Sequence, residues 1–184
     1  IMTCLMKQKN NPAFKVLLKC IEETDNHMDV GILGGRVLFH VLSAFGKSDL
    51  AFSMIVRPDF PSYGYWVSQG STTLWESFHL QLPDGKIGSF NHHFWGDISG
   101  WFIQWILGIQ LNPHFNDIKE IKLCPQFISS LSHAEGYHEA PDGKISVSWA
   151  RENDWKIDLK VSIPETMHGQ IILPNDWEFP NGTS

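Results

Sequence analysis

The stretch ISGWFIQWILGIQLNP, residues 98–113, divides the sequence into a helical part and a strand-rich part. Its apolar residues Ile98, Trp101, Phe102, Trp105, Ile106 and Ile109 recur at helical spacings of three and four. This spacing predicts a last helix with a wide apolar face, which Gly108 ends. Pro113 follows, and beyond it the apolar period becomes two. We therefore expect a domain boundary near Leu111 to Pro113, between residues 1–112 and 113–184.

Two earlier helices carry the same kind of apolar spacing and clear end signals. Their apolar positions are Phe14, Leu17, Leu18 and Ile21 in the first, and Val37, Leu38, Val41, Leu42 and Phe45 in the second. Pro12 suits the first turn of the first helix, and Asp25-Asn26 supplies a stop. The segment Gly31 to Gly35 predicts a flexible entry to the second helix, which Gly46 closes just beyond its C-terminus.

A third helix is expected to start with Ser48 as its cap. Pro58 and Pro61 forbid its continuation, since proline removes a backbone donor and collides with the preceding turn. An irregular stretch then leads through Tyr63 to Trp66, and stretches of this kind often carry functional residues.

Beyond Pro113 the alternation of apolar and polar residues predicts half-buried antiparallel strands. The apolar positions are Ile145, Val147 and Trp149 in one strand, and Ile157, Leu159, Val161 and Ile163 in the next. Arg151 to Asp154 is expected to connect them as a hairpin, and Pro141-Asp142-Gly143 is typical of a turn into the first. Ile121 with Leu123, and Ile171 with Leu173, predict two further short strands. A small antiparallel β-sandwich is the expected fold of this part.

Composition excludes several classes of partner. A formal charge of −6 and a pI near 5.8, without a basic cluster, argue against nucleic acid and against an anionic membrane surface. No apolar run approaches the roughly 18–20 residues that a membrane span needs. The three cysteines are scattered without a CxxC spacing, so the sequence signals neither a zinc site nor a disulfide framework. The sequence also opens part-way into a helical pattern, so we expect it to be the C-terminal part of a longer protein, and the compartment stays open.

The segment around Glu76 and the pair His92-His93 combine a carboxylate, imidazoles and indoles, which sugar chemistry uses. Glu76 directly follows Trp75, and a carboxylate in an apolar setting can serve as a general base. Each feature also has a plain structural explanation. Glu76 is then a surface residue beside a core tryptophan, and His92 is a hydrogen-bonded structural histidine. The aromatic residues Tyr63, Tyr65, Trp66, Trp75 and Trp95 either stack on sugar rings in a cleft or fill the core.

The candidate ligands for a metal site are His79, His92, His93 and Asp97. None of the usual ligand spacings, HxH or HExxH, is present. Adjacent histidines in an extended segment point to opposite faces, which makes joint ligation difficult. We therefore expect no metal and no cofactor.

Several short segments of the helical part follow one another in a characteristic order. They are DVGILG at residues 29–34, LAF at 50–52, YGYWV at 63–67, GSTTLWE at 70–76 and SFNH at 89–92. In this order and at these distances they resemble the bacterial α-L-rhamnosidases of glycoside hydrolase family 78. The resemblance implies that residues 1–112 are the last helices of an (α/α)6 catalytic barrel and that residues 113–184 are the C-terminal β-sandwich.

The same resemblance implies the roles of two residues. Glu76 falls on the general base that activates water in an inverting hydrolysis, and His92 falls on the histidine that contacts the bound rhamnose. The general acid would lie upstream of the sequence, and the missing barrel segment or further copies would cover the apolar helix faces. The expected partner is a rhamnosyl carbohydrate. The alternative is a truncated fragment of the same fold that binds carbohydrate or assists assembly without catalysing hydrolysis.

Overall fold

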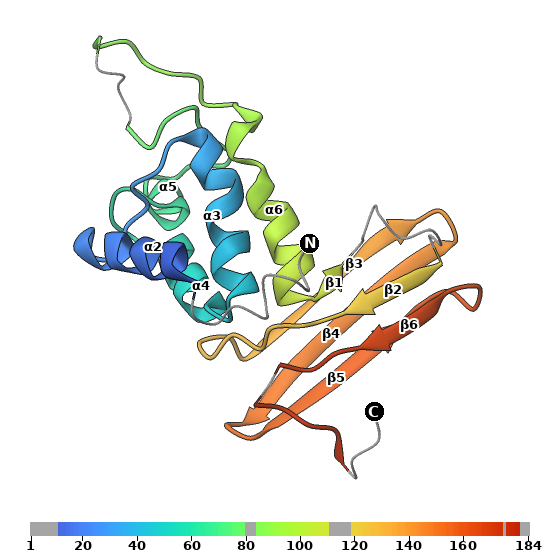
Figure 1. Ribbon diagram of the computed structural model, residues 1–184. Coiled ribbons are helices and arrows are strands. Elements are labelled where there is room, and N and C mark those ends of the chain that lie inside the picture. The colour runs from blue at the N-terminus through green and yellow to red at the C-terminus, as the bar shows by residue number, and fades with distance from the viewer. Residues whose placement is uncertain (1–10, 80–83, 111–118, 175, 181–184) are drawn as a thin grey trace. The chain divides into compact units, whose positions relative to one another are not determined.

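The computed structural model describes residues 11–79, 84–110, 119–174 and 176–180. The chain forms two compact units, Ile1–Ile98 and Ser99–Ser184, and each is described by itself. The first unit is helical, and the second begins with the last helical residues and continues in strands, as the change of apolar period predicts (Figure 1). The expected boundary at Leu111 to Pro113 lies outside the described residues and stays a prediction.

Helix α2 (Pro12–Glu23) begins and ends as its sequence predicts. The Asn11 side chain accepts hydrogen bonds from the backbone N–H groups of Ala13 and Phe14, and Pro12 occupies the first helical position. After the helix, Asp25 and Asn26 take left-handed backbone angles, with φ of 53° and 57°. Asp and Asn tolerate this conformation better than most residues, which confirms them as the stop.

Helix α3 (Ile32–Ala44) starts earlier than expected. The prediction of a flexible entry over Gly31 to Gly35 is wrong, because Gly34 and Gly35 lie inside the helix. Gly35 is buried, and a Cβ built on it would lie 2.4 Å from Cζ3 of Trp95, so the missing side chain makes room for an indole ring. Gly46 has φ of 74°, which confirms it as the glycine that follows the helix.

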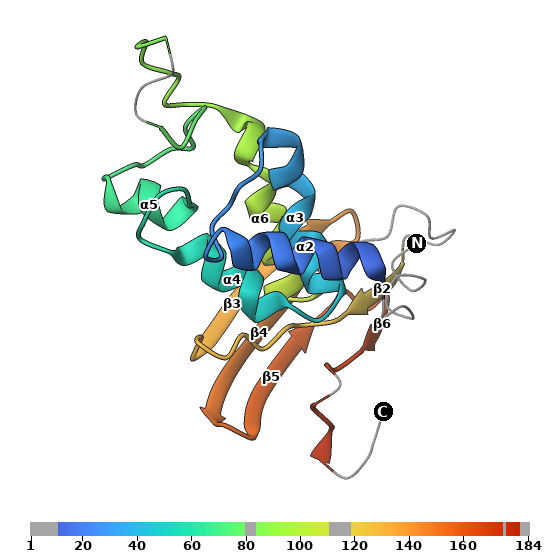
Figure 2. The ribbon, with the colours of Figure 1, turned by 60° about the vertical axis from the view of Figure 1, so that its left-hand side comes forward.

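Helix α4 (Ser48–Val56) has Ser48 as its first residue rather than its cap, and the chain then forms a short helix, α5 (Tyr63–Ser68), that the sequence analysis missed. Ser62 caps α5. Its hydroxyl accepts from the Tyr65 N–H at 2.8 Å and donates to the Arg57 carbonyl at 2.5 Å. Figure 2 shows α2 across the front of α3 and α4, where the ring of Phe14 stacks on that of Phe45 at 4.1 Å.

The predicted last helix is divided into two short helical pieces, an α-helix, α6 (Asp97–Trp101), and a π-helical turn, η2 (Phe102–Ile106). A 3-10 turn, η1 (His93–Trp95), precedes them. The prediction that Ile109 belongs to the helix is wrong, because this residue begins strand β1 (Ile109–Gln110). Gly108 turns the chain between them with φ of 75°, and a Cβ at this position would lie 2.1 Å from the backbone nitrogen of Pro125.

The second unit is a sandwich of two three-stranded sheets, which confirms the predicted architecture. One sheet has the order β1-β2-β6, with β2 at Glu120–Leu123 and β6 at His168–Ile171. The other has the order β3-β4-β5, with β3 at His133–Ala140, β4 at Gly143–Asn153 and β5 at Lys156–Ser162. All pairs are antiparallel except β2 with β6, which is parallel and was not expected.

The core of the sandwich lies between its two sheets, which overlap in Figure 1. Its buried members are Leu107, Ile109, Ile121, Leu123, Ile145, Val147 and Met167. Trp149, at 1% exposure, donates its indole N–H to the Ile106 carbonyl at 3.0 Å. The inward positions of β4 are those that the alternation predicts.

The strand boundaries correct the sequence analysis in three places. The hairpin between β4 and β5 turns at Asp154 and Trp155, so Arg151 and Asn153 belong to β4. Strand β5 ends at Ser162 and strand β6 ends at Ile171, so neither Ile163 nor Leu173 lies in a strand. Strand β3 was missed altogether, because its inward positions are small or polar rather than large and apolar. One of them, Gly136, leaves space for Leu107, whose Cδ1 would lie 2.5 Å from a Cβ there.

Several large apolar side chains of the helices face outward. Leu33 is 81% exposed and Val37, one turn later on α3, is 56% exposed. That these faces pack against further chain or other copies stays a prediction. Among the described residues, no helix has the length and apolar content of a membrane span.

Candidate functional site

The segments that carry Glu76 and His92 lie side by side. The backbone N–H of Glu76 donates to the Ser89 carbonyl at 2.8 Å, and the N–H of His92 donates to the Leu74 carbonyl at 2.8 Å. The Thr73 hydroxyl adds a hydrogen bond to the Phe90 carbonyl. These bonds join residues 73–76 to residues 89–92 in antiparallel fashion, although neither segment is a regular strand. The structure thus brings together the two segments that the sequence analysis singled out.

Glu76 is half-buried and is held through its backbone and its side chain. Its Oε2 accepts a hydrogen bond from the Ser89 N–H at 3.0 Å. Its carbonyl oxygen accepts one from the indole N–H of Trp95 at 3.2 Å. Trp75 and Phe78, on either side, are buried at 8% and 7% exposure. Glu76 therefore stands on the border of an apolar cluster with its carboxylate oriented by a backbone amide.

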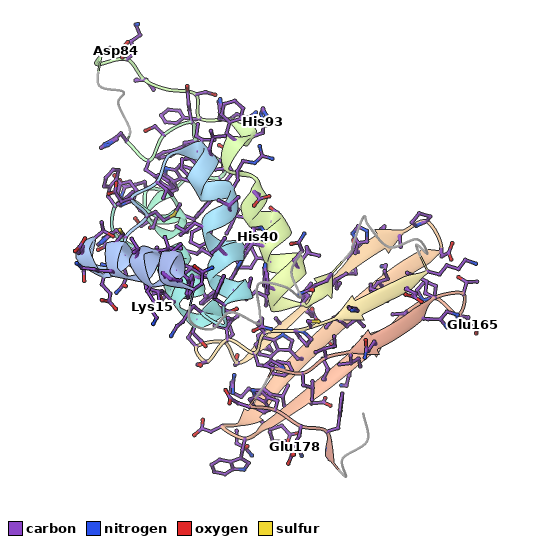
Figure 3. The ribbon with its side chains drawn as sticks, in the orientation of Figure 1. Lys15, His40, Asp84, His93, Glu165 and Glu178 are labelled. Atoms are coloured by element: carbon purple, nitrogen blue, oxygen red, sulfur yellow. The ribbon has the colours of Figure 1, made fainter. Side chains whose placement is uncertain are left out.

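His92 begins the 3-10 turn η1 in an extended conformation, with φ of −133°. Its Nδ1 accepts a long hydrogen bond from the Phe94 N–H at 3.5 Å. The His92 and Phe94 rings are T-shaped, with their centroids 4.1 Å apart. A neutral histidine that accepts through Nδ1 carries its hydrogen on Nε2. His92 can therefore donate from Nε2. His93, next to it, is exposed and is labelled near the start of α6 in Figure 3.

The aromatic residues beneath the two segments form core rather than a sugar-binding cleft. Tyr63, Trp66, Trp75 and Trp95 are all at most 9% exposed, and Phe78 stacks on Trp66 at 4.3 Å. Only Tyr65, of the five residues considered for stacking on sugar, is half-buried. The other four are too enclosed to meet a ligand.

Tyr63 connects this aromatic cluster to the chain that follows His92. Its hydroxyl donates to the Trp95 carbonyl at 3.0 Å. Burial raises the pKa of Tyr63 well above its ordinary value, so the hydroxyl stays protonated and keeps donating.

Two of the four candidate metal ligands, Asp97 and His79, make other contacts. Asp97 accepts from His40 of α3 at 2.9 Å, and His40 is labelled in Figure 3. The His79 ring packs on Phe60 at 4.4 Å. Across the part of the chain that the structure describes, no three His, Cys, Asp or Glu residues are grouped as metal ligands.

A charged network fixes the connections before α3 and after α4. Arg57 donates to both carboxylate oxygens of Asp59 at 2.9 Å and to the Asp25 carbonyl at 2.7 Å. His27 contacts the same Asp59 carboxylate at 3.0 Å. The hydrogen bond from Arg57 holds the pKa of Asp59 well below its usual range, with His27 acting in the same direction. The charged groups of Arg57, Asp59 and His27 thus satisfy one another.

Two residues that matter for the site escaped the sequence analysis. Ser89 acts through its backbone, which no side-chain pattern reveals. Trp95 was considered only for its ring, whereas its indole N–H reaches the carbonyl of Glu76, 19 residues earlier. A tryptophan close after the histidine pair was the one available signal.

Two family models match the chain and together account for most of it. The bacterial alpha-L-rhamnosidase 6 hairpin glycosidase domain matches residues 1–106. The bacterial alpha-L-rhamnosidase C-terminal domain matches residues 108–179. The two matches meet where the helical pieces give way to strand β1.

Similar proteins and structures agree with the family models. An alpha-L-rhamnosidase from Alteromonas sp. (strain LOR) is 33% identical over 98% of this chain, which spans 20% of that relative. The alpha-L-rhamnosidase structure from Dictyoglumus thermophilum has a TM-score of 0.78 at 27% identity, covering 88% of this chain and 18% of that one. The Streptomyces avermitilis alpha-L-rhamnosidase, solved in complex with L-rhamnose, has a TM-score of 0.74 at 29% identity, covering 84% and 15%. The chain spans a fifth or less of each of these proteins.

Proposed function

This chain belongs to the bacterial α-L-rhamnosidase family, and from that premise we propose that it forms the C-terminal part of an inverting glycosidase that releases terminal α-L-rhamnose. Glu76 is the general base and His92 contacts the sugar. The observation that carries this proposal is the pairing of residues 73–76 with residues 89–92, which presents a carboxylate and an imidazole from neighbouring segments.

Glu76 activates the water molecule that attacks the sugar. Its Oε2 accepts the Ser89 N–H, so we assign the other oxygen, Oε1, to the water. As the water oxygen bonds to the anomeric carbon, its proton passes to Glu76 and the glycosidic bond breaks on the opposite face. A general acid protonates the leaving oxygen. In inverting enzymes the two carboxyl groups lie about 6.5–9.5 Å apart, which leaves room for the water.

His92 orients the substrate by donating a hydrogen bond from Nε2 to a rhamnose hydroxyl. The Phe94 N–H at Nδ1 supports this role, because it favours the tautomer that carries hydrogen on Nε2. The half-buried ring also packs in a T-shaped arrangement against the Phe94 ring.

The general acid comes from a part of the enzyme outside these 184 residues. The length of the relatives supports this arrangement, since the chain spans only 20% of the Alteromonas protein. That same shortness favours a second candidate function, in which the chain is a truncated fragment that binds carbohydrate or assists assembly without hydrolysing it. An activity assay of the protein encoded by the complete reading frame distinguishes the two candidate functions, because only the glycosidase predicts turnover of an aryl α-L-rhamnoside.

The decisive experiment replaces Glu76 by Gln in that complete protein. Turnover of the aryl α-L-rhamnoside should fall by roughly 10²–10⁴-fold, the usual contribution of general base catalysis, with the melting temperature unchanged. Asp84→Asn is the matched control, because Asp84 is an exposed carboxylate on the same connection, paired with Lys86 (Figure 3). Turnover by Glu76→Gln equal to that of the control would exclude Glu76 as the base.

A second experiment tests the sugar contact and the stereochemistry. His92→Ala should raise KM more than it lowers kcat, whereas His93→Ala, at the exposed neighbouring ring, should leave both nearly unchanged. Proton NMR of the early reaction should show β-L-rhamnose as the first product. An α-anomer formed first would contradict the inverting mechanism.

A further inference from the structure

The geometry points to a positioning residue for this site: we propose that Trp95 fixes the backbone of Glu76 relative to His92. The proposal rests on the function proposed for Glu76. Trp95 does not touch the substrate, and it acts through the carbonyl of Glu76, which accepts its indole N–H at 3.2 Å.

Glu76 is held from two directions. Ser89 contacts it twice, accepting its backbone N–H at 2.8 Å and donating to its carboxylate at 3.0 Å. These two bonds fix Glu76 to the neighbouring segment, which is itself exposed at Ser89 and Phe90. The third bond comes from Trp95, which is 5% exposed and belongs to the core. Of these three hydrogen bonds, the one from Trp95 joins Glu76 to a side chain of the buried cluster.

Trp95 is also coupled to His92. The two residues are the end and the cap of the same 3-10 turn, η1. A displacement of Trp95 is therefore transmitted to His92 through three residues of hydrogen-bonded chain. One side chain thus joins the proposed base to the proposed sugar contact.

The indole of Trp95 is itself well fixed. The Tyr63 hydroxyl donates to the backbone carbonyl of Trp95 at 3.0 Å. The centroid of the Phe78 ring lies 4.7 Å from that of the Trp95 ring. On the α3 side it fills the space above Gly35, where a Cβ would lie 2.4 Å from Cζ3. An indole with this little freedom can hold the Glu76 carbonyl in one position, as a catalytic carboxylate requires.

The chain offers a matched control in Trp66. Its ring centroid is 6.3 Å from that of Trp95, and at 2% exposure it is equally buried. Among the described residues, its indole nitrogen is one of the buried polar atoms without a hydrogen-bond partner. Replacing either tryptophan by phenylalanine removes a similar volume from the same cluster, but only at Trp95 does it also remove a hydrogen bond to Glu76.

The experiment compares Trp95→Phe with Trp66→Phe in the complete protein. Trp95→Phe should lower kcat for the aryl α-L-rhamnoside by about tenfold or more, with KM changed less than threefold, because misplacing a catalytic group mainly slows the chemical step. It should also shift the acidic limb of the kcat/KM profile, which reports the general base. Trp66→Phe should leave kcat within about twofold, and both melting temperatures should stay within about 5 °C of wild type.

Gly35→Ala provides a second route to the same displacement. It pushes the indole away from α3 while leaving its N–H intact, so it should lower kcat in the same way as Trp95→Phe. If Trp95→Phe fails to fold, the kcat of Gly35→Ala decides the matter. Equal kcat values for wild type, Trp66→Phe and the Trp95 or Gly35 variant would overturn the proposal.

The outcome for Glu76→Gln keeps the two claims separate. A Glu76→Gln enzyme that retains its turnover would refute the proposed function. A Glu76→Gln enzyme that loses turnover, together with a Trp95→Phe enzyme that behaves like Trp66→Phe, would refute only the positioning role.

Discussion

In the sandwich, β4 is hydrogen-bonded along its length to β3 on one side and to β5 on the other, whereas the described chain from Gln69 to His92 is neither helix nor strand. The first arrangement fixes side chains by regular backbone pairing. The second fixes Glu76 and His92 by a few individual hydrogen bonds above a buried aromatic cluster. Substitutions in the sandwich should therefore mainly lower the free energy of unfolding. Substitutions around Glu76 should mainly lower turnover.

The largest expected effect separates two tryptophans of the sandwich. Trp149→Ala should destabilise the unit by about 4 kcal/mol, because it removes a fully buried indole and leaves the Ile106 carbonyl unpaired. Trp155→Ala, in the turn of the same hairpin at 80% exposure, should change stability by less than about 0.5 kcal/mol. Urea unfolding measures both. Similar losses for the two would mean that burial does not govern stability there.

Two glycines, one in the helical part and one in the strand-rich part, allow the cost of adding a Cβ to be compared between the two parts. Gly46 and Gly108 have nearly equal φ of 74° and 75°, but a Cβ meets nothing within 4 Å at Gly46 and the Pro125 backbone nitrogen at 2.1 Å at Gly108. Gly46→Ala should cost about 1 kcal/mol from the left-handed conformation alone. Gly108→Ala should cost about 3 kcal/mol, since the collision adds to it. Equal losses in thermal unfolding would show that the surroundings of Gly108 yield easily.

The charged network of the helical part should make its stability depend on pH. The pKa of Asp59 is depressed in the folded state, so its contribution is present above the unfolded pKa of about 4 and is lost as pH falls below it. The melting temperatures of wild type and Asp59→Asn should differ at pH 7 and converge toward about pH 2. Asp158→Asn, which breaks an exposed pair with Lys160 in the sandwich, should change the melting temperature less at pH 7. A constant difference for Asp59→Asn across this range would contradict the assignment.

The smallest expected difference is in the chemical reactivity of two cysteine thiols, which can be measured in the folded protein without any substitution. Cys20, on α2, is exposed, whereas burial raises the pKa of Cys124 in the sandwich to about 11. Because the thiolate is the reactive form, iodoacetamide at pH 8 should label Cys20 within minutes and Cys124 only after unfolding. Peptide mass spectrometry reads both sites. Early labelling of Cys124 would indicate that the sandwich opens locally.

Three helix ends, the start and end of α2 and the end of α3, were predictable because their signals are local. Pro12, Asn26 and Gly46 each act on backbone angles within a turn, so the residue type suffices to place them. Ile109 was misplaced because its spacing from Ile98 fits a helix as well as it fits a strand that follows a turn. Strand β3 was missed because its inward positions are small or polar, and at one of them, Gly136, Leu107 from a distant part of the sequence fills the space of a side chain.

The candidate site was predictable in its residues but not in its construction. Glu76 and His92 stood out by residue type and by resemblance to a family. Glu76 is held by the backbone amide of Ser89 and by the indole N–H of Trp95, which lie 13 and 19 residues away in the sequence. Such contacts depend on how distant segments meet, which the order of residues does not encode in any short pattern. The same holds for the four enclosed aromatic residues, whose burial decided against sugar stacking.

The parallel pairing of β2 with β6 has a consequence for the order of folding. In its register Leu123 faces Ile171, and the whole β3-β4-β5 sheet lies between them in the sequence. Closing so long a loop from an unfolded chain carries a large entropic cost, whereas β3, β4 and β5 meet through short turns. Once these three strands have paired, less unordered chain separates β2 from β6, so the entropic cost of joining them falls. We therefore expect the three-stranded meander to fold first and the strand from His168 to Ile171 to dock last.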